Sequence, residues 1–282
     1  MLSVAQQLKD AKADLFIVVE SLEDQAAKAA ELFMIKHQIK FELVNFSLEL
    51  FRELDTQRYS NASLMRLCLN KIISANYDRV LYLDSDILAL QPLSPLLDID
   101  LFGRALGAVP EVKLTAGRGF ITDRHRRQLG IAPNAEYFNS GVLLLDWHKT
   151  RVEKLLEKSY AMLKSRQDFK FLDQDVLNLT FVDNWHALPL KWNAEQSAIC
   201  YLDVQPALRH FNHAAKPWDW PGVMGYEPFH HYYVQALEGL ELSSFLQKKK
   251  TGNPVLANAE IYLRKSSFHI RKRLQKHFVN FL

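Results

Sequence analysis

Short apolar runs alternate with longer segments of helical composition along this chain, and this alternation constrains the fold more than any other feature. The runs with the length and apolar content of buried strands are residues 14–19, 39–44, 79–83, 105–109, 140–147 and 207–211. The segments with helical composition are residues 25–36, 61–76, 122–130, 149–165, 172–181 and 226–238. The alternation predicts an α/β fold whose mixed, mostly parallel sheet is flanked by helices. In such sheets, ligands bind beyond the carboxyl ends of the strands.

The length of 282 residues allows one large α/β domain or two small ones with a sizeable core. The two cysteines, Cys68 and Cys200, are far apart in the sequence, which fits a reducing compartment and indicates no disulfide framework. No apolar run approaches the roughly 20 residues that a membrane-spanning helix needs. The opening MLSVAQQLKDAKAD lacks the basic and apolar regions of a signal peptide. We therefore expect a cytoplasmic protein, either soluble or peripheral to a membrane.

Basic residues gather at the C-terminus. Residues 248–282 contain one acid, Glu260, and nine basic residues: Lys248, Lys249, Lys250, Arg264, Lys265, Arg271, Lys272, Arg273 and Lys276. The net charge of the whole chain is only +3, so the main body is acidic, which argues against nucleic acid as a partner. The tail also has apolar residues at near-helical spacing: Ile270, Leu274, Phe278 and Phe281. This pattern predicts a basic amphipathic helix that binds an anionic membrane surface, and an ordinary C-terminal helix with solvated lysines is the alternative.

The stretch RVLYLDSDILAL, residues 79–90, ends an apolar strand on two carboxylates, Asp84 and Asp86. In an extended segment these side chains point the same way, because residues i and i+2 share a face. Two carboxylates at one point repel each other unless a cation neutralises them. Mg²⁺ binds one or two protein carboxylates together with waters and substrate phosphates, and Mn²⁺ also suits oxygen ligands. The pair therefore predicts a divalent-cation site that holds a phosphorylated substrate.

Two other interpretations of the Asp pair stay open at this point. A solvated turn or a helix N-cap produces the same pattern, although neither needs a buried strand before it. Haloacid-dehalogenase-like phosphatases use Asp-x-Asp as nucleophile and acid/base, but their motif continues with Gly or Ala and then Thr or Val. Here Ile87 and Leu88 follow, which fits that motif poorly.

Three further stretches place polar residues at the ends of predicted elements. They are YFNSGVLLLD with Asn139, Ser140 and Gly141, FLDQDVLN with Asp173, Gln174 and Asp175, and RHFNHAAKPW with His210, His213, Lys216 and Trp218. Taken singly, they fit a strand-entry turn, an acidic helix start and a surface loop. In order and spacing, together with the Asp pair, they resemble glycosyltransferase family 8, whose members include bacterial lipopolysaccharide galactosyl- and glucosyltransferases. The resemblance runs from about residue 2 to 240.

The resemblance implies a GT-A fold, that is, a Rossmann-like nucleotide-diphospho-sugar transferase domain, over residues 1–247, followed by the basic tail 248–282. It implies a hexosyltransferase that moves glucose or galactose from a UDP-sugar to a glycan acceptor such as lipopolysaccharide core. The basic tail resembles the membrane-binding end of the lipopolysaccharide enzymes. The protein is then expected at the inner face of the membrane, as a peripheral cytoplasmic enzyme.

The resemblance also implies a metal site. The family's Asp-x-Asp looks like Asp84-Ser85-Asp86, and its two aspartates bind the Mn²⁺ or Mg²⁺ that bridges the diphosphate of a UDP-sugar. The third ligand in the family is a motif histidine that matches His210, and a neutral imidazole is a reasonable ligand for Mn²⁺. Lys216 matches the lysine that contacts the diphosphate. These groups would stabilise the negative charge that grows on UDP as it leaves.

The sugar side of the site is implied by the same resemblance. The residues that match donor-binding positions are Arg66, Glu111, Asn139, Ser140, Gly141, Asp173 and Gln174. The family retains configuration at the anomeric carbon, and classical retention uses a carboxylate nucleophile where this chain has the amide Gln174. Front-face attack is therefore favoured, with Gln174 stabilising an oxocarbenium-like transition state and the β-phosphate oxygen taking the proton of the acceptor hydroxyl. A glycosyl-enzyme intermediate on Asp173 or Asp175 is the alternative.

The sequence departs from the family pattern at two places. The first strand and its "ADxxY" loop, which hold uracil and ribose, have no counterpart, and MLSVAQQL resembles the helix that follows them. We expect from this that Met1 is internal to a longer product. His213 stands where the family has a glycine that lets the backbone approach the phosphates, and it would either block that approach or add a contact. If the uridine pocket is absent, the alternative function is an inactive relative that acts as a binding or regulatory module.

Overall fold

The computed structural model describes residues 2–8, 11–20, 31–32, 34–36, 38–54, 61–112, 121–132, 135–166, 168–195, 198–199 and 202–212. Three predictions lie outside these residues. They are the helix over residues 226–238, the roles of His213 and Lys216, and the basic tail 248–282.

The strand β6 (Phe138–Asp146) forms the centre of the largest sheet among the described residues. It pairs antiparallel with β3 (Arg79–Leu83) on one side and with β5 (Leu106–Pro110) on the other. Beyond β5 lies β7 (Trp185–Ala187), which is parallel to it. The apolar run from Val142 to Leu145 explains the central position of β6, because both faces of this strand are buried.

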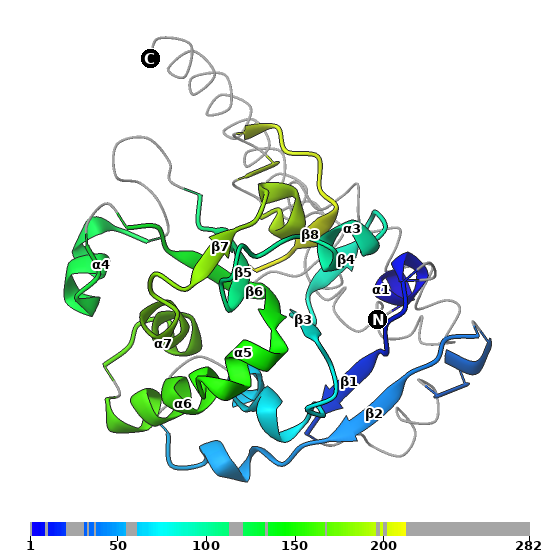
Figure 1. The fold of residues 1–282 in the computed structure, drawn as a ribbon, viewed down its shortest axis with the longest axis horizontal. Helices are drawn as coiled ribbons and strands as arrows, with labels where there is room; N and C mark the ends of the chain where they lie inside the picture. The colour runs from blue at the N-terminus through cyan, green and yellow to red at the C-terminus, as the bar shows by residue number, and fades with distance from the viewer. Residues whose placement is uncertain are drawn as a thin grey trace, which may run out of the picture.

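Two smaller sheets lie beside the central one (Figure 1). In one, β1 (Phe16–Val19) runs parallel to β2 (Glu42–Asn45). In the other, β4 (Ile87–Ala89) runs antiparallel to β8 (Leu208–His210). The mixed α/β character is confirmed. The parallel pairings are the minority among the described strand pairs, however, because β6 is antiparallel to both of its neighbours.

Helices cover the sheets. The α-helices whose bounds the described residues define are α1 (Leu2–Gln7), α3 (Ser94–Leu97), α4 (Asp123–Leu129), α5 (Trp147–Val152), α6 (Leu155–Ser165) and α7 (Leu172–Thr180). The 3₁₀ segments are η1 (Leu48–Phe51), η2 (Asn61–Lys71) and η4 (Leu190–Asn193). The segment η2 replaces the helix expected over residues 61–76, and its backbone is non-helical at Cys68. The single helix expected over residues 149–165 is two helices, because Lys154 between them has a left-handed backbone with φ 53°.

Two apolar clusters fill the space between these layers. The larger packs η2, α6 and α7 against β3, β5 and β6, and it includes the fully buried Trp147 and Phe138. The smaller lies around β4, α3 and β8 and includes Leu93 and Val142. The strand β6 contributes side chains to both clusters, so it fixes the two layers relative to each other. Within the described part of the chain, no helix combines the length and apolar content needed to cross a membrane.

Candidate functional site

The Asp pair lies in a tight turn between β3 and β4. The amide of Asp84 donates to the carbonyl of Gly141 at 2.9 Å, which continues the β3–β6 ladder by one residue. The amide of Ile87 then donates to the carbonyl of Asp84 at 3.2 Å, so the chain turns rather than staying extended. The expectation that strand alternation aligns the two carboxylates is therefore wrong, and the turn does this instead. Ser85, between the two aspartates, is exposed.

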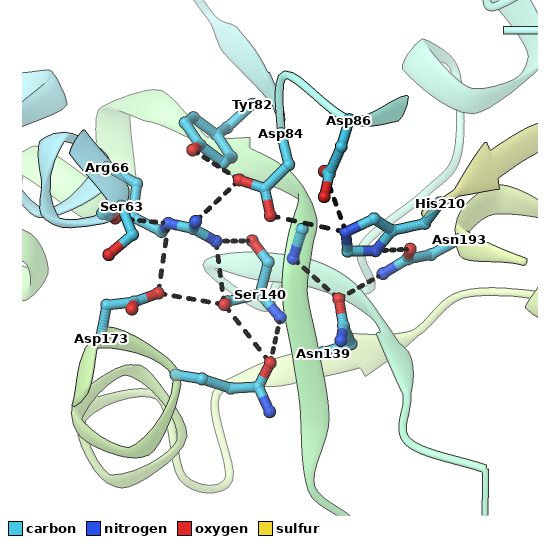
Figure 2. Close-up of polar contacts among 12 residues, drawn as sticks. Ser63, Arg66, Tyr82, Asp84, Asp86, Asn139, Ser140, Asp173, Asn193 and His210 are labelled. Atoms are coloured by element: carbon cyan, nitrogen blue, oxygen red, sulfur yellow. Dashed lines mark hydrogen bonds and ion pairs between the residues drawn. The ribbon is translucent and has the colours of Figure 1, made fainter. Parts of the chain in front are cut away.

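Both carboxylates of the Asp pair face His210 (Figure 2). The side chain of His210 reaches them because β4 pairs with β8, where Ile87 lies opposite His210. Nε2 of His210 lies 3.2 Å from Oδ1 of Asp86 and 3.7 Å from Oδ2 of Asp84. The ligand atoms of the three residues all lie within 4.8 Å of one another. The structure therefore brings together the three residues expected to bind a cation.

The donor set fits a small, hard divalent cation. Two ligands on opposite sides of a Mg²⁺ ion are about 4 Å apart, because each Mg²⁺–O bond measures about 2.0–2.1 Å. The separations among Asp84, Asp86 and His210 need only small side-chain movements to reach this value. Two carboxylate oxygens and one imidazole nitrogen leave positions for waters or phosphate oxygens.

The other ring nitrogen of His210 is bound to a residue that the sequence did not single out. Nδ1 of His210 lies 2.8 Å from Oδ1 of Asn193, at the end of η4. The other side of the Asn193 amide donates to Oδ1 of Asn139 at 2.8 Å. A lone asparagine after an apolar turn carries no motif signal, so sequence reasoning had no means of finding Asn193.

The guanidinium of Arg66, from η2, joins the Asp pair to the residues of α7. It donates to Oδ1 of Asp84 at 2.7 Å and lies 3.2 Å from Oδ2 of Asp173. It also donates to the carbonyl of Ser140 at 2.6 Å and to the Ser140 hydroxyl at 2.9 Å. Burial by itself lowers the pKa of Arg66, but the charges of Asp173 and Asp84 outweigh it, and the pKa lies above its ordinary value. Arg66 therefore stays charged.

Tyr82, on β3, is a second residue of the site that the sequence did not single out. Its hydroxyl donates to Oδ1 of Asp84 at 2.7 Å, and its ring lies 4.8 Å from the guanidinium carbon of Arg66. Burial raises its pKa well above the ordinary value, and the charge of Asp84 adds to this although the charge of Arg66 opposes it, so the hydroxyl remains a donor. Tyr82 thus helps to fix the orientation of one carboxylate of the Asp pair.

The expected sugar-side residues form one hydrogen-bonded cluster. Oε1 of Gln174 accepts from the amide of Ser140 at 3.0 Å, and its Nε2 donates to Oε1 of Glu111 at 3.2 Å. Nδ2 of Asn139 donates to the same oxygen of Glu111 at 3.0 Å. Burial, and then the charge of the nearby Glu195, raises the pKa of Glu111 to about 8. Glu195 was not singled out from the sequence.

A bulge in β6 explains how three consecutive residues, Asn139, Ser140 and Gly141, all lie at this cluster. The pairing register between β5 and β6 shifts between Ala108, which faces Leu143, and Val109, which faces Asn139. The intervening residues of β6, Ser140 to Val142, have no partner on β5. A bulge of this kind bends the strand and redirects side chains and amides, and it is frequent beside active sites. Asn139, Ser140 and Gly141 therefore belong to a strand, not to the strand-entry turn that was expected.

The two aspartates of α7 have different surroundings. Asp173 accepts from the Ser140 hydroxyl at 3.1 Å and pairs with Arg66, and burial raises its pKa. Asp175 is completely buried and has other partners. It accepts hydrogen bonds from the Tyr137 hydroxyl at 2.5 Å and from the amide of Phe171 at 2.9 Å, and it lies 2.7 Å from Nε2 of His125. Asp175 thus stabilises the first turn of α7.

The comparison with protein families gives one match over most of the chain. The model of the family described as "Glycosyl transferase family 8" matches residues 2–220. This range contains both halves of the candidate site, from Arg66 to His210. The match excludes the phosphatase interpretation of the Asp pair.

Individual relatives are distant. General stress protein A of Bacillus subtilis is 22% identical over 262 residues, which cover 86% of each chain. Lipopolysaccharide 1,2-glucosyltransferase of Escherichia coli is 28% identical over 243 residues, which cover 80% of this chain and 68% of that protein. The crystal structure of an active-site mutant of LgtC has a TM-score of 0.72 at 23% identity and covers 85% of this chain and 93% of its own. At this identity, the likeness to LgtC shows the fold alone.

Proposed function

Because this chain belongs to glycosyltransferase family 8, we propose that it transfers a hexose, glucose or galactose, from a UDP-sugar to a glycan acceptor. We further propose that transfer retains the anomeric configuration and depends on Mn²⁺ or Mg²⁺. The observation that carries the proposal is the convergence of Asp84, Asp86 and His210 within 4.8 Å, joined through Arg66 to the residues of α7.

The metal end of the site has the chemistry that a leaving nucleoside diphosphate needs. A bound Mn²⁺ or Mg²⁺ acts as a Lewis acid that neutralises charge on the diphosphate. Asp84 and Asp86 supply the carboxylates and His210 the imidazole of the proposed ligand set. Arg66 holds Asp84 from the side opposite His210, so the carboxylate is oriented before the cation arrives. Lys216, outside the described residues, is proposed to contact the diphosphate.

The sugar end favours front-face attack over a covalent intermediate. Asp175 is fully buried and engaged by Tyr137 and Phe171, so it is not available as a nucleophile. Asp173 is held by Arg66 and Ser140, which lowers its nucleophilicity. We propose that Gln174 stabilises the oxocarbenium-like transition state while the leaving phosphate takes the proton of the acceptor hydroxyl.

A donor screen tests this function. The protein is incubated with UDP-glucose, UDP-galactose and other UDP-sugars, with Mn²⁺ or with a chelator, and free UDP and sugar products are followed by mass spectrometry. We expect Mn²⁺-dependent release of UDP from one donor and its loss in Asp86→Ala. Turnover of no UDP-hexose, with retained binding of a UDP-sugar, would support the alternative of an inactive binding or regulatory module.

The proposal extends to the acceptor and the location. Lipopolysaccharide core or another lipid-linked glycan at the inner membrane face is the proposed acceptor, with residues 248–282 binding the anionic surface. Co-sedimentation with vesicles containing anionic lipid, at low and high salt, compares the full chain with one that ends at residue 247. Equal binding of the two chains contradicts the role of the tail.

A further inference from the structure

We propose that Asn193 is a positioning residue for the cation site, because it holds His210 in the tautomer that presents Nε2 to the cation. The proposal rests on the proposed metal-dependent function. It concerns a hydrogen-bonded chain that runs from β6 through η4 to β8, formed by Gly141, Asn139, Asn193 and His210. Figure 2 shows Asn139, Asn193 and His210 in this order beside the Asp pair.

A backbone amide sets the donor-to-acceptor direction of this series of hydrogen bonds. The N–H of Gly141 can only donate, and it donates to Oδ1 of Asn139 at 2.9 Å. The opposite end of the Asn139 amide, Nδ2, donates to the carboxylate of Glu111. The Gly141 amide can only donate, so the oxygen of Asn139 must face it, and this fixes the orientation of the Asn139 side-chain amide.

The orientation of Asn139 then fixes Asn193. Because the Asn139 oxygen accepts, the group that faces it at 2.8 Å must be the Nδ2 of Asn193. The Oδ1 of Asn193 consequently faces His210, and it can only accept. Nδ1 of His210, at 2.8 Å, must donate to it. In the neutral ring that a cation requires, the lone pair is thus on Nε2, which points at Asp84 and Asp86.

Close packing keeps the ring of His210 in this place. A Cβ on residue 141 would lie 2.3 Å from Cε1 and 2.8 Å from Nδ1 of His210, so the ring packs directly against the backbone of β6. His210 is only 3% exposed and Asn193 only 2%, so water has little access to replace the asparagine oxygen. Without Asn193, Nδ1–H loses its partner, and the packed ring no longer favours the tautomer that leaves Nε2 unprotonated.

Three variants separate positioning from mere packing. Asn193→Leu fills a similar volume but offers no acceptor, whereas Asn193→Asp keeps an acceptor for Nδ1. Asn184→Leu is the matched control, because the side-chain oxygen of this asparagine also accepts a hydrogen bond, from the amide of Ala105 at 3.0 Å, but lies outside the site. Mn²⁺ binding to each protein is measured by electron paramagnetic resonance, and folding by thermal unfolding.

We expect Asn193→Leu to bind Mn²⁺ about 10- to 100-fold more weakly than the wild type, as for other partners of metal-bound histidines. Asn193→Asp should lose clearly less affinity than Asn193→Leu, because it keeps the acceptor for Nδ1 although it loses the donor to Asn139. Asn184→Leu should melt at a lower temperature with unchanged Mn²⁺ affinity. Equal losses in Asn193→Leu and Asn193→Asp would contradict positioning through the acceptor oxygen.

A spectroscopic measurement tests the tautomer even if a variant does not fold. Long-range ¹H–¹⁵N correlation spectra of the Mg²⁺-bound wild type, assigned by comparison with His210→Gln, should show a protonated Nδ1 and an unprotonated Nε2 for His210. A proton on Nε2 instead overturns the proposal.

Mn²⁺ binding to the wild type and to Asp86→Ala distinguishes failure of the proposed cation site from failure of the proposed role of Asn193. If the wild type binds no Mn²⁺, the proposed cation site fails together with this inference. If Asp86→Ala loses Mn²⁺ but Asn193→Leu does not, only this inference fails.

Discussion

Among single side chains, Arg66 does most to join the two ends of the candidate site. Its guanidinium binds Asp84 from the metal end and Asp173 from α7, and it also donates to the carbonyl of Ser140. These acceptors are buried or half-buried, so water cannot readily replace the arginine. A planar, five-donor group suits this arrangement, whereas an ammonium group has three donors around a single point.

Arg66→Lys should therefore destabilise the protein although it keeps the charge. We expect a loss of roughly 1–3 kcal/mol in the free energy of unfolding, because at least one buried acceptor loses its partner. Arg66→Met should cost more, about 3–5 kcal/mol, because it leaves Asp84 and Asp173 without the buried cation. Urea unfolding measures both variants. Arg52→Lys is the control, since Arg52 forms an exposed pair with Glu49, and an equal loss there would contradict the explanation.

The raised pKa of Glu111 makes the folding stability of the protein depend on pH. Its pKa is raised from an ordinary value of 4.5 to about 8 in the folded protein, because burial and Glu195 disfavour its charge. The folded protein therefore binds this proton more tightly than the unfolded chain does. The resulting stabilisation is fully present below pH 4.5 and is lost as the pH rises through about 8.

Glu111→Gln should remove this loss. Between about pH 5 and pH 9, we expect the unfolding free energy of the wild type to fall by on the order of a few kcal/mol more than that of the variant. Denaturant unfolding across this range, without metal, measures the difference. Parallel pH profiles of the two proteins would show that Glu111 ionises normally in the folded state.

The residues that sequence alone could identify are those with a motif. Asp84, Asp86 and His210 stand in recognisable patterns, and the structure brings them together. Tyr82 and Asn193 do not, because their importance comes from the pairing of β3 with β6 and from the position of η4. Asn193, for example, contacts His210, 17 positions later, and Asn139, 54 positions earlier, and no local pattern encodes either contact.

At the level of helices and strands, apolar periodicity predicted well where an element lies, but it predicted poorly whether that element is unbroken. The strand predicted over residues 79–83 is β3 with the same bounds. The helix predicted over residues 149–165 is broken at Lys154, where the backbone is left-handed. Lysine has a favourable helix propensity, so nothing in the sequence indicated that the helix is interrupted at this residue. The strand β4 was not predicted, because three apolar residues after the Asp pair are too few to show a period.

Lys154→Gly should stabilise the protein. A left-handed conformation costs a residue with a Cβ about 1–2 kcal/mol, while glycine adopts it freely but loses more backbone entropy on folding. We expect a net gain of roughly 0.5–1 kcal/mol in unfolding free energy, measured by urea denaturation. Lys158→Gly, within α6, is the matched control and should lose about 1 kcal/mol. A loss in both variants would show that the left-handed residue carries no strain.

For the molecule as a whole, the expected GT-A fold is confirmed by the likeness to LgtC. The expected direction of the strands was less accurate. Alternating strands and helices favour parallel pairing, but β6 enters the sheet antiparallel to β3 and β5, and a pattern of apolar residues carries no information on direction. Near its N-terminal end, β6 contacts residues from η2, α7 and η4 through Asn139 and Ser140.

The site therefore collects side chains from distant parts of the chain: Arg66 from η2, the Asp pair from the turn after β3, Gln174 from α7 and His210 from β8. A ligand that contacts several of these elements must stabilise the folded state as a whole. Its contribution follows from mass action and reaches about 2.7 kcal/mol when the free ligand is at 100 times its dissociation constant.

Mn²⁺ together with UDP should accordingly raise the temperature of thermal unfolding, and the rise should grow with concentration. Asp86→Ala should show no such rise, because it removes one ligand of the proposed cation site. Asp168→Ala should respond like the wild type, since Asp168 pairs with Arg166 on the surface. Differential scanning calorimetry with each ligand alone and with both measures the effect. A wild-type protein that unfolds at the same temperature with and without Mn²⁺ and UDP would show that the elements around the Asp pair do not bind a metal–nucleotide complex, whatever their geometry.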